Sequence, residues 1–326
     1  MTYAAGLEEI QAAADRIEGV AHRTPVATCS TLDRMSGRRL YFKCENLQKT
    51  GSFKFRGAWN SVAMLTAEQA SRGVVTHSSG NHAQALALAA RRRGIEAHIV
   101  MPNNSTPVKR RAVEEYGGRV VACAPTLEAR ESTAVKVLAE TGGTFIHPYN
   151  YADTIAGQGT VGLELLEDVG DLDAIVAPVG GGGLLSGICI AARGLNPRVR
   201  LFAGEPQGAD DAARSMAAGR LVPQTSPRTV ADGLRTSLGV LTWPIIRDHV
   251  ERVITVDDEE IVRAMRLAWE RAKILIEPSA AVAVAAVLSA EFRELKGIDS
   301  VGVVLSGGNV NLDELPWTPR EKPGAA

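Results

Sequence analysis

Residues 43–58 read Lys43-Cys44-Glu45-Asn46-Leu47-Gln48-Lys49-Thr50-Gly51-Ser52-Phe53-Lys54-Phe55-Arg56-Gly57-Ala58. A polar loop that contains Gly51 and Ser52 runs into a helix-compatible segment that begins at Phe53, so we expect Lys54 in the first turn of a helix. The positive end of a helix disfavours a cation by about 0.3 to 1 kcal/mol, and Phe53 and Phe55 would flank the amine with apolar surface. A desolvated ammonium loses its proton easily, and the neutral amine is a nucleophile that reacts with carbonyl groups. A surface lysine that reaches solvent is the alternative.

The order of strand, loop and helix recurs along the chain. Apolar runs predict strands at 40–44, 74–77, 97–102, 119–122, 174–179, 199–203 and 301–305. Amphipathic segments predict helices between them, at 83–93, 107–116, 126–141, 155–168 and 184–192. Strands that alternate with helices of about ten residues indicate parallel sheets with right-handed crossovers. We therefore expect an α/β protein in which residues 73–148 form one compact unit.

Composition favours a small-molecule ligand. The 326 residues include 36 basic and 37 acidic side chains, so no general attraction to nucleic acid or to acidic membranes is expected. The four cysteines lie far apart and form no C-x-x-C pair, which argues against a zinc site or a disulfide framework and favours a reducing cytoplasm. The N-terminus lacks a signal-peptide pattern, and no apolar run approaches the roughly 18 residues of a membrane span.

The tetrad Gly180-Gly181-Gly182-Gly183 lies between an apolar strand and a helix. Its backbone N–H groups can converge on an anion such as phosphate at the positive helix end. A simple turn is less favoured, because each glycine costs about 0.5 to 1 kcal/mol relative to alanine. A dinucleotide (NAD) site with Glu205 as the ribose acid is the competitor. Its G-x-G-x-x-G spacing fails, because two registers end at Leu185 or Ser186, and the register that ends at Gly187 becomes helical too early.

Two further loops carry polar groups. Ser78-Ser79-Gly80-Asn81-His82 follows a strand and precedes a helix, so it should face the same cleft as the glycine tetrad. Its hydroxyl and N–H groups suit a carboxylate, although a serine N-cap explains the local pattern equally well. The segment Glu205-Pro206-Gln207-Gly208-Ala209-Asp210-Asp211 offers hard oxygen ligands for Mg²⁺, Mn²⁺ or Ca²⁺. Taken alone, it fits a solvated acidic loop better.

The string Gly51-Ser52-Phe53-Lys54-Phe55-Arg56-Gly57-Ala58 resembles the cofactor-lysine segment of the pyridoxal-phosphate enzymes of the tryptophan synthase β fold type, specifically the serine/threonine dehydratase and serine racemase family. The resemblance extends from Thr24-Pro25 to Asn309. Its other telling pieces are Ser79-Gly80-Asn81-His82, Ile155-Ala156-Gly157-Gln158-Gly159-Thr160, the glycine tetrad, Ala231-Asp232-Gly233, Thr242-Trp243-Pro244-Ile245-Ile246-Arg247-Asp248 and Ile276-Glu277-Pro278. It implies fold type II, with two open, mostly parallel twisted sheets flanked by helices. Residues 1–72 and 149–326 would form a large cofactor domain, and residues 73–148 a small mobile substrate domain.

The resemblance also implies site residues. Pyridoxal 5'-phosphate would be held by Lys54 and contacted by Phe53, Asn81, Gly180, Gly181, Gly182, Gly183, Leu184, Gly233, Glu277 and Ser306. Asn81 would bond the phenolic oxygen of the cofactor and Ser306 its pyridine nitrogen, and a serine there suits elimination because it leaves that nitrogen largely unprotonated. Taken alone, Ser306 could equally cap the strand end. The substrate would contact Ser78, Ser79, Gly80, Asn81, His82 and Arg130.

Other ligands follow from the same resemblance. A divalent cation would bind at Glu205, Ala209 and Asp211. ATP would act as an effector at a nucleotide site formed by Lys49, Thr50, Gln84, Tyr116 and Asn309, although Cys29 stands where the family has a serine. A homodimer is expected.

The implied activity is that of an ammonia-lyase, which converts L-threonine or L-serine to a 2-oxo acid and ammonia. Lys54 would be the general base, and Ser79 could serve as the acid on the opposite face in serine racemisation, because threonine dehydratases that only eliminate typically have alanine there. Serine racemase proper and a 3-hydroxyaspartate ammonia-lyase that uses Arg130 are the alternatives within the family, and a non-catalytic phosphate-ligand binding protein is the alternative outside it. Tyr149 replaces the asparagine that serine racemases have after His-Pro, so the substrate preference stays open. The chain ends soon after the last strand, which favours a catabolic role without an amino-acid-sensing domain.

Overall fold

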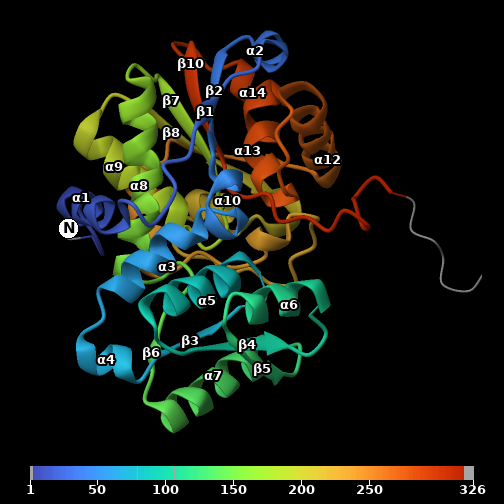
Figure 1. The fold of residues 1–326 in the computed structure, drawn as a ribbon. Helices are drawn as coiled ribbons and strands as arrows, with labels where there is room; N and C mark the ends of the chain where they lie inside the picture. The colour runs from blue at the N-terminus through green and yellow to red at the C-terminus, as the bar shows by residue number, and fades with distance from the viewer. Residues whose placement is uncertain (1–2, 79, 106, 319–326) are drawn as a thin grey trace, which may run out of the picture.

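The computed structural model describes residues 3–78, 80–105 and 107–318 and contains two sheets (Figure 1). The larger sheet has the strand order β1-β2-β10-β7-β8-β9, and only β1 is antiparallel to its neighbour. Its strands are β1 Val26–Ala27, β2 Arg39–Cys44, β7 Ala174–Pro178, β8 Arg200–Pro206, β9 Arg252–Val256 and β10 Ser300–Leu305. The smaller, fully parallel sheet has the order β5-β4-β3-β6. Its strands are β3 Val74–His77, β4 Ala97–Pro102, β5 Arg119–Cys123 and β6 Thr144–Phe145. The prediction of two open, mostly parallel sheets is confirmed.

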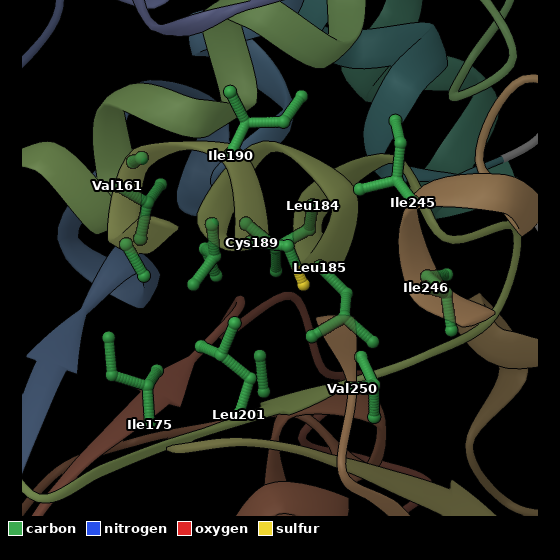
Figure 2. Close-up of a cluster of buried hydrophobic side chains, with 14 of the residues drawn as sticks. Val161, Ile175, Leu184, Leu185, Cys189, Ile190, Leu201, Ile245, Ile246 and Val250 are labelled. Carbon is green, nitrogen blue, oxygen red and sulfur yellow. The ribbon is translucent and has the colours of Figure 1, made fainter. Parts of the chain in front are cut away.

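Helices cover both faces of the larger sheet, because successive side chains of a strand point to opposite faces. Ile175 and Leu201 face one apolar cluster, which contains α1 Leu7–Ile17, α8 Ala152–Val169, α9 Gly183–Leu195 and α11 Trp243–His249. Val176 and Phe202 face the other, which contains α2 Ser30–Ser36, α12 Asp258–Leu267, α13 Pro278–Leu288 and α14 Ala290–Arg293. Figure 2 shows Leu185 and Cys189 of α9 above Ile175 and Leu201. This packing holds the first turn of α9, which follows the glycine tetrad.

The smaller sheet is covered in the same way. Val74 and Ile99 pack with α3 Lys54–Ala63, α5 Asn81–Arg93 and α6 Pro107–Glu115, whereas Val75 and Val100 pack with α7 Leu127–Thr141. The remaining helices are α4 Ala67–Ser71, α10 Asp211–Ala218, the short 3₁₀ turns η1 Glu45–Leu47, η2 Lys49–Gly51, η3 Gln207–Ala209 and η4 Asp232–Leu234, and the π turn η5 Ala268–Ala272. No described helix is long and apolar enough to span a membrane. The domain boundaries at 72/73 and 148/149 stay a prediction.

Helix α3 joins the two halves of the molecule, because it packs against both α5 and α8. Its crossing with α8 is a backbone contact between two glycines. A Cβ atom on Gly157 would lie 2.6 Å from the Cα atom of Gly57, a distance that no side chain tolerates. Lys54 is the first residue of α3, as predicted, so the packing of this helix places the lysine between the two sheets.

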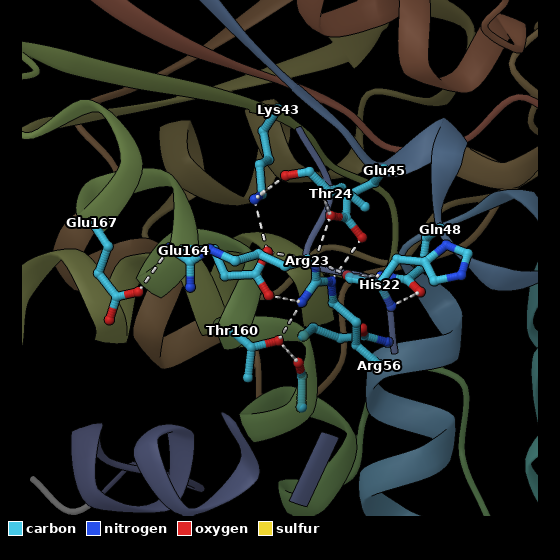
Figure 3. A network of polar contacts seen from close by, with 12 residues as sticks. His22, Arg23, Thr24, Lys43, Glu45, Gln48, Arg56, Thr160, Glu164 and Glu167 are labelled. Carbon is cyan, nitrogen blue, oxygen red and sulfur yellow. Dashed lines mark hydrogen bonds and ion pairs between the residues drawn. The ribbon is translucent and has the colours of Figure 1, made fainter. Parts of the chain in front are cut away.

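A buried ionic network anchors the start of α3 (Figure 3). The Arg56 guanidinium contacts both oxygens of Glu45, at 2.8 Å each, and both oxygens of Glu164, at 2.6 and 2.8 Å. The Lys43 ammonium lies 2.7 Å from Glu164, and both cationic side chains are fully buried. Burial would lower the pKa of Arg56, but attraction to Glu45 and Glu164 outweighs burial and raises it. The network ties α3 to β2 and α8.

Arg56→Ala should lower the free energy of unfolding by about 3 to 5 kcal/mol, because it leaves the buried Glu45 carboxylate without its cation and removes one of the two cations that hold Glu164. Urea denaturation of the variant and parent measures the difference. Arg266→Ala is the matched control, since Arg266 pairs with Glu270 on the exposed surface and should cost at most about 1 kcal/mol. Equal losses in the two variants would contradict this role for Arg56.

Candidate active site

A cavity of about 790 Å³ opens where the carboxyl ends of strands from both sheets meet. Most of the predicted cofactor and substrate residues line it, namely Phe53, Lys54, Ser78, Gly80, Asn81, His82, Arg130, Gly180, Gly181, Gly182, Gly183, Leu184, Gly233, Glu277 and Ser306. The expectation that the loops after β3 and β7 face one cleft is therefore confirmed. Ser79 lies outside the described residues.

Lys54 presents its amine to this cavity. The ammonium donates a hydrogen bond to the Pro148 carbonyl at 2.8 Å and lies 5.0 Å from the centre of the Phe53 ring. Burial lowers the pKa of Lys54 to about 8, and the charge of Glu277 partly opposes this shift. The expected desolvation is present, but only Phe53 contacts the amine as predicted. Phe55 is fully buried in the apolar cluster with α5 and Val74.

The glycine tetrad presents N–H groups at the start of the 13-residue helix α9. Within the described part of the chain, no acceptor bonds the backbone N–H groups of residues 180–184. This arrangement could hold a phosphate group, because unpaired N–H groups and the helix dipole both attract anions.

The structure changes the reason why these positions are glycine. A Cβ atom would lie 3.0 Å from the Leu234 backbone at Gly180, 2.3 Å from the Tyr149 ring at Gly181, and 2.9 Å from the Tyr149 Cβ at Gly183. Gly182 adopts a φ of +88°, which L side chains rarely tolerate. Close packing at three positions and the positive φ at Gly182 therefore explain all four glycines. The entropic cost of the tetrad does not by itself indicate phosphate, and the inference rests on the N–H groups.

Glu277 organises the side of the cavity next to β10. Its carboxylate accepts hydrogen bonds from the Asn81 amide at 2.8 Å and from the backbone N–H of Asn309 at 3.1 Å. The Asn309 side chain in turn donates to Asn81 at 2.8 Å. Burial, followed by the neighbouring charge of Asp232, raises the pKa of Glu277 to about 8. These hydrogen bonds fix the orientation of the Asn81 amide at the cavity wall.

Sequence reasoning missed two histidines of the cavity wall, His77 and His147. Each lies at or just after the carboxyl end of a strand, which is the one signal that could have identified them. Burial lowers the pKa of both and of His82, that of His147 to about 4. The Nδ1 atom of His147 accepts from the backbone N–H groups of Tyr149 and Asn150, so its proton resides on Nε2. All three rings are neutral at physiological pH.

Arg130 and Ser78, two of the predicted substrate residues, also line the cavity. The Nε atom of Arg130 is buried and has no hydrogen-bonding partner among the residues that the structure describes. Ser78 accepts a hydrogen bond from the Gly80 N–H at 3.3 Å. An arginine without a carboxylate partner in a cavity is suited to bind an anionic group of a ligand.

The acidic loop, residues 205–211, lies outside the cavity. Glu205 accepts hydrogen bonds from the N–H groups of Ala212 and Ala213 at 2.8 Å each, which turns it toward α10. In this position Glu205 does not suit the acidic residue that binds the ribose of a dinucleotide. The NAD alternative therefore lacks this residue as well as the glycine spacing. Burial raises the pKa of Glu205 to about 8 and that of Asp211 to about 6. One buried Asp211 oxygen, Oδ1, has no described partner. The described residues form no cluster of three or more His, Cys, Asp or Glu side chains suited to a metal.

The predicted nucleotide residues are only partly brought together. Gln84 and Asn309 line the cavity, and Asn309 donates to the Thr50 carbonyl at 2.7 Å. Thr50 has a φ of +59°, which is unusual for a β-branched residue, and burial followed by Arg92 lowers the pKa of Lys49. Tyr116 packs against the apolar cluster of α3 and α5 instead of lining the cavity.

A lysine at a helix start and a helix N-terminus whose N–H groups find no acceptor among the described residues line one cavity between two α/β units. This arrangement suits an enzyme with a phosphate-bearing cofactor. The family described as "Pyridoxal-phosphate dependent enzyme" matches residues 17–307, and the chain belongs to that family.

Individual relatives match nearly the full chain. Serine racemase of Arabidopsis thaliana is 52% identical over 316 residues, 96% of either chain. The β-hydroxyaspartate dehydratase of Paracoccus denitrificans is 48% identical and covers 95% of this chain and 98% of its own length. The structure of maize serine racemase superimposes with a TM-score of 0.94 at 50% identity and covers 95% of either chain.

Lys54 should titrate near pH 8 in the cofactor-free protein, instead of near the usual 10.5. The rate at which added pyridoxal phosphate is captured, followed by absorbance, should therefore rise with pH to a midpoint near 8, because only the neutral amine reacts. Glu277→Gln should move the midpoint lower, since the charge of Glu277 raises the pKa of Lys54. Lys54→Ala gives the background rate. A midpoint near 10.5 would show that burial does not act on this amine.

Proposed function

We propose that the protein is a pyridoxal-phosphate-dependent ammonia-lyase, which converts L-serine or L-threonine to a 2-oxo acid and ammonia, with serine racemisation as a second activity. The observation that carries the proposal is the Lys54 amine, with its lowered pKa, in one cavity with the unpaired N–H groups of the glycine tetrad. Relatives named serine racemase and β-hydroxyaspartate dehydratase support this class of reaction.

When bound, pyridoxal phosphate supplies an electron sink that makes the Cα proton of an amino acid acidic. Each residue of the cavity then has a distinct task. The tetrad N–H groups would hold the phosphate, while Asn81 and Ser306 would contact the ring. Lys54 in its neutral form would take the Cα proton, and the Pro148 carbonyl, 2.8 Å from the amine, orients it. Neutral histidines around Lys54 add no competing positive charge.

Elimination and racemisation differ in one requirement. Inverting Cα needs a proton donor on the face opposite Lys54, and we propose Ser79 for that role on the basis of its place in the loop. If Ser79 only binds the substrate carboxylate, the protein is a dehydratase alone.

Pyruvate and D-serine formation from L-serine test the proposal. Lys54→Ala should reduce both by about 100-fold or more, the range expected for losing a general base. Ser79→Ala should lose D-serine formation and retain pyruvate formation. A parent that binds pyridoxal phosphate but turns over none of serine, threonine and 3-hydroxyaspartate would favour the non-catalytic alternative. D-serine formation at the parent rate by Ser79→Ala would exclude Ser79.

A second substrate, 3-hydroxyaspartate, is favoured by Arg130. Its side chain lines the cavity, and its buried Nε atom has no hydrogen-bonding partner among the described residues. We therefore propose that Arg130 binds the second carboxylate of a dicarboxylic substrate. The relative named β-hydroxyaspartate dehydratase supports this assignment.

Arg130→Gln should lower kcat/KM for 3-hydroxyaspartate by about 10- to 100-fold, the value of a charge-assisted hydrogen bond of about 1.5 to 3 kcal/mol. The kcat/KM for L-serine should change much less, because serine has no second carboxylate. Steady-state assays with both substrates give the ratio. An equal loss for both would assign Arg130 a general structural role.

We propose that the acidic loop binds a divalent cation, Mg²⁺, Mn²⁺ or Ca²⁺, through Glu205, Asp211 and the carbonyl of Ala209. The unpartnered Oδ1 of Asp211 and the raised pKa of both carboxyls support this, because a cation would supply the missing counter-charge.

Excess Mg²⁺ should raise the melting temperature, since saturation at a hundred times Kd stabilises the native state by about 2.7 kcal/mol. Asp211→Ala should abolish the rise. Asp210→Ala is the matched control, because Asp210 instead pairs with Arg214 and should leave the rise intact. A rise that persists in Asp211→Ala would dismiss the site.

We also infer an ATP effector site at Lys49, Thr50, Gln84, Tyr116 and Asn309, supported by the buried Thr50 hydroxyl, which has no hydrogen-bonding partner among the described residues. We propose that residues 73–148 move as a unit relative to 1–72 and 149–326. The ion pair between Lys109 and Asp232, at 2.7 Å across the cavity, supports that proposal as a contact of the closed form. We propose in addition that the protein is a homodimer and that it is located in the cytoplasm. The four free thiols support the cytoplasmic location.

A further inference from the structure

One irregular segment, residues 228–238, is held at both ends by the acidic loop. We refer to it as the strap. At its start, the Arg228 N–H donates to the Gly208 carbonyl at 2.8 Å, and at its end the Leu238 N–H donates to Asp211 Oδ2 at 2.8 Å. A Cβ atom on Gly208 would lie 1.7 Å from the Arg228 carbonyl oxygen. Loop and strap are thus in backbone contact that only glycine allows.

The middle of the strap forms a wall of the cavity. Its lining residues are Asp232, Gly233, Leu234, Arg235, Thr236 and Ser237. The Thr236 hydroxyl lies 2.9 Å from the Tyr149 hydroxyl. Directly after the strap, the Gly239 N–H and the Thr242 hydroxyl donate to the Gly181 carbonyl, at 3.2 and 2.8 Å. The strap therefore reaches Tyr149, and the residues directly after it reach the glycine tetrad.

Tyr149 lies between the two reactive parts of the site. Its ring covers Gly181, and it meets the His147 ring edge-on at 4.5 Å. Pro148, the preceding residue, accepts the hydrogen bond of Lys54. Burial raises the pKa of Tyr149, so its hydroxyl keeps its proton, and Thr236 is its hydrogen-bonding partner. The phenol and the carbonyl that Lys54 contacts thus belong to adjacent residues, Tyr149 and Pro148.

We propose that Thr236 is a positioning residue of the reaction, which fixes Tyr149 and through it the Pro148 carbonyl that faces Lys54, and that the acidic loop sets the place of Thr236 through the strap. The inference rests on the proposed role of Lys54. It does not require a bound cation, because the contacts between loop and strap are hydrogen bonds of the protein itself.

Hydrogen exchange of the holoenzyme in metal-free buffer tests this proposal on two pairs of variants. Thr236→Val removes only the hydroxyl, and Thr236→Ser restores it. Asp211→Ala removes the acceptor for Leu238, whereas Asp211→Asn keeps a carbonyl oxygen there. The readouts are the exchange rates of the Tyr149 and Asn150 amides, both bonded to the His147 ring, together with kcat and KM for L-serine.

Thr236→Val and Asp211→Ala should each speed exchange at Tyr149 and Asn150 by roughly three- to tenfold, as expected when a neutral hydrogen bond is lost. Both should lower kcat more than they change KM, and Thr236→Ser and Asp211→Asn should restore parent behaviour. Unchanged exchange at 149–150 in Thr236→Val, or equal behaviour of its Val and Ser variants, would overturn the proposal. So would an effect of Asp211→Ala confined to the strap. Hydrogen exchange is measured without substrate. A parent that is inactive on L-serine, L-threonine and 3-hydroxyaspartate would therefore contradict the proposed function but not the contacts tested by exchange.

Discussion

The buried contact between Arg56 and two carboxylates is the constraint on which the site depends. Glu45 follows β2, Glu164 belongs to α8, and the guanidinium that joins them lies two residues after Lys54. Removing these charges from water is costly, and the cost is offset only while all partners stay in place. Helix α3 therefore has one position relative to β2 and α8 of the larger unit, and its first residue lies in the cavity between the two sheets.

Burial shapes the chemistry of that cavity because it disfavours the charged forms of its ionisable groups. It lowers the pKa of Lys54 and His147 and raises that of Glu277. A lysine that is partly neutral at physiological pH can act both as a nucleophile and as a base. An anionic cofactor and an anionic substrate would then bind mainly to the N–H donors of the glycine tetrad and to the charged Arg130 side chain.

Tyr149 connects the parts of the molecule that the reaction needs. It packs on the glycine tetrad, follows the proline that orients Lys54, and shares a hydrogen bond with the strap. The strap in turn is held from the acidic loop, outside the cavity. A segment that lines the cavity is thus hydrogen-bonded at both ends to a loop that does not line it.

Local patterns determined much of this protein: the parallel α/β order, Lys54 at a helix start, and a glycine tetrad before α9, because strand and helix periods and helix-end chemistry are properties of neighbouring residues. Family motifs added further cavity residues, such as Arg130, Glu277 and Ser306, but not His77 or His147. Only the tertiary structure decided that Phe55 packs away from Lys54 and that Glu205 turns toward α10. It also decided that the glycines make room for Tyr149 and Leu234, and that the short strands β1 and β6 form. These outcomes depend on contacts between residues far apart in the chain, which no local pattern encodes.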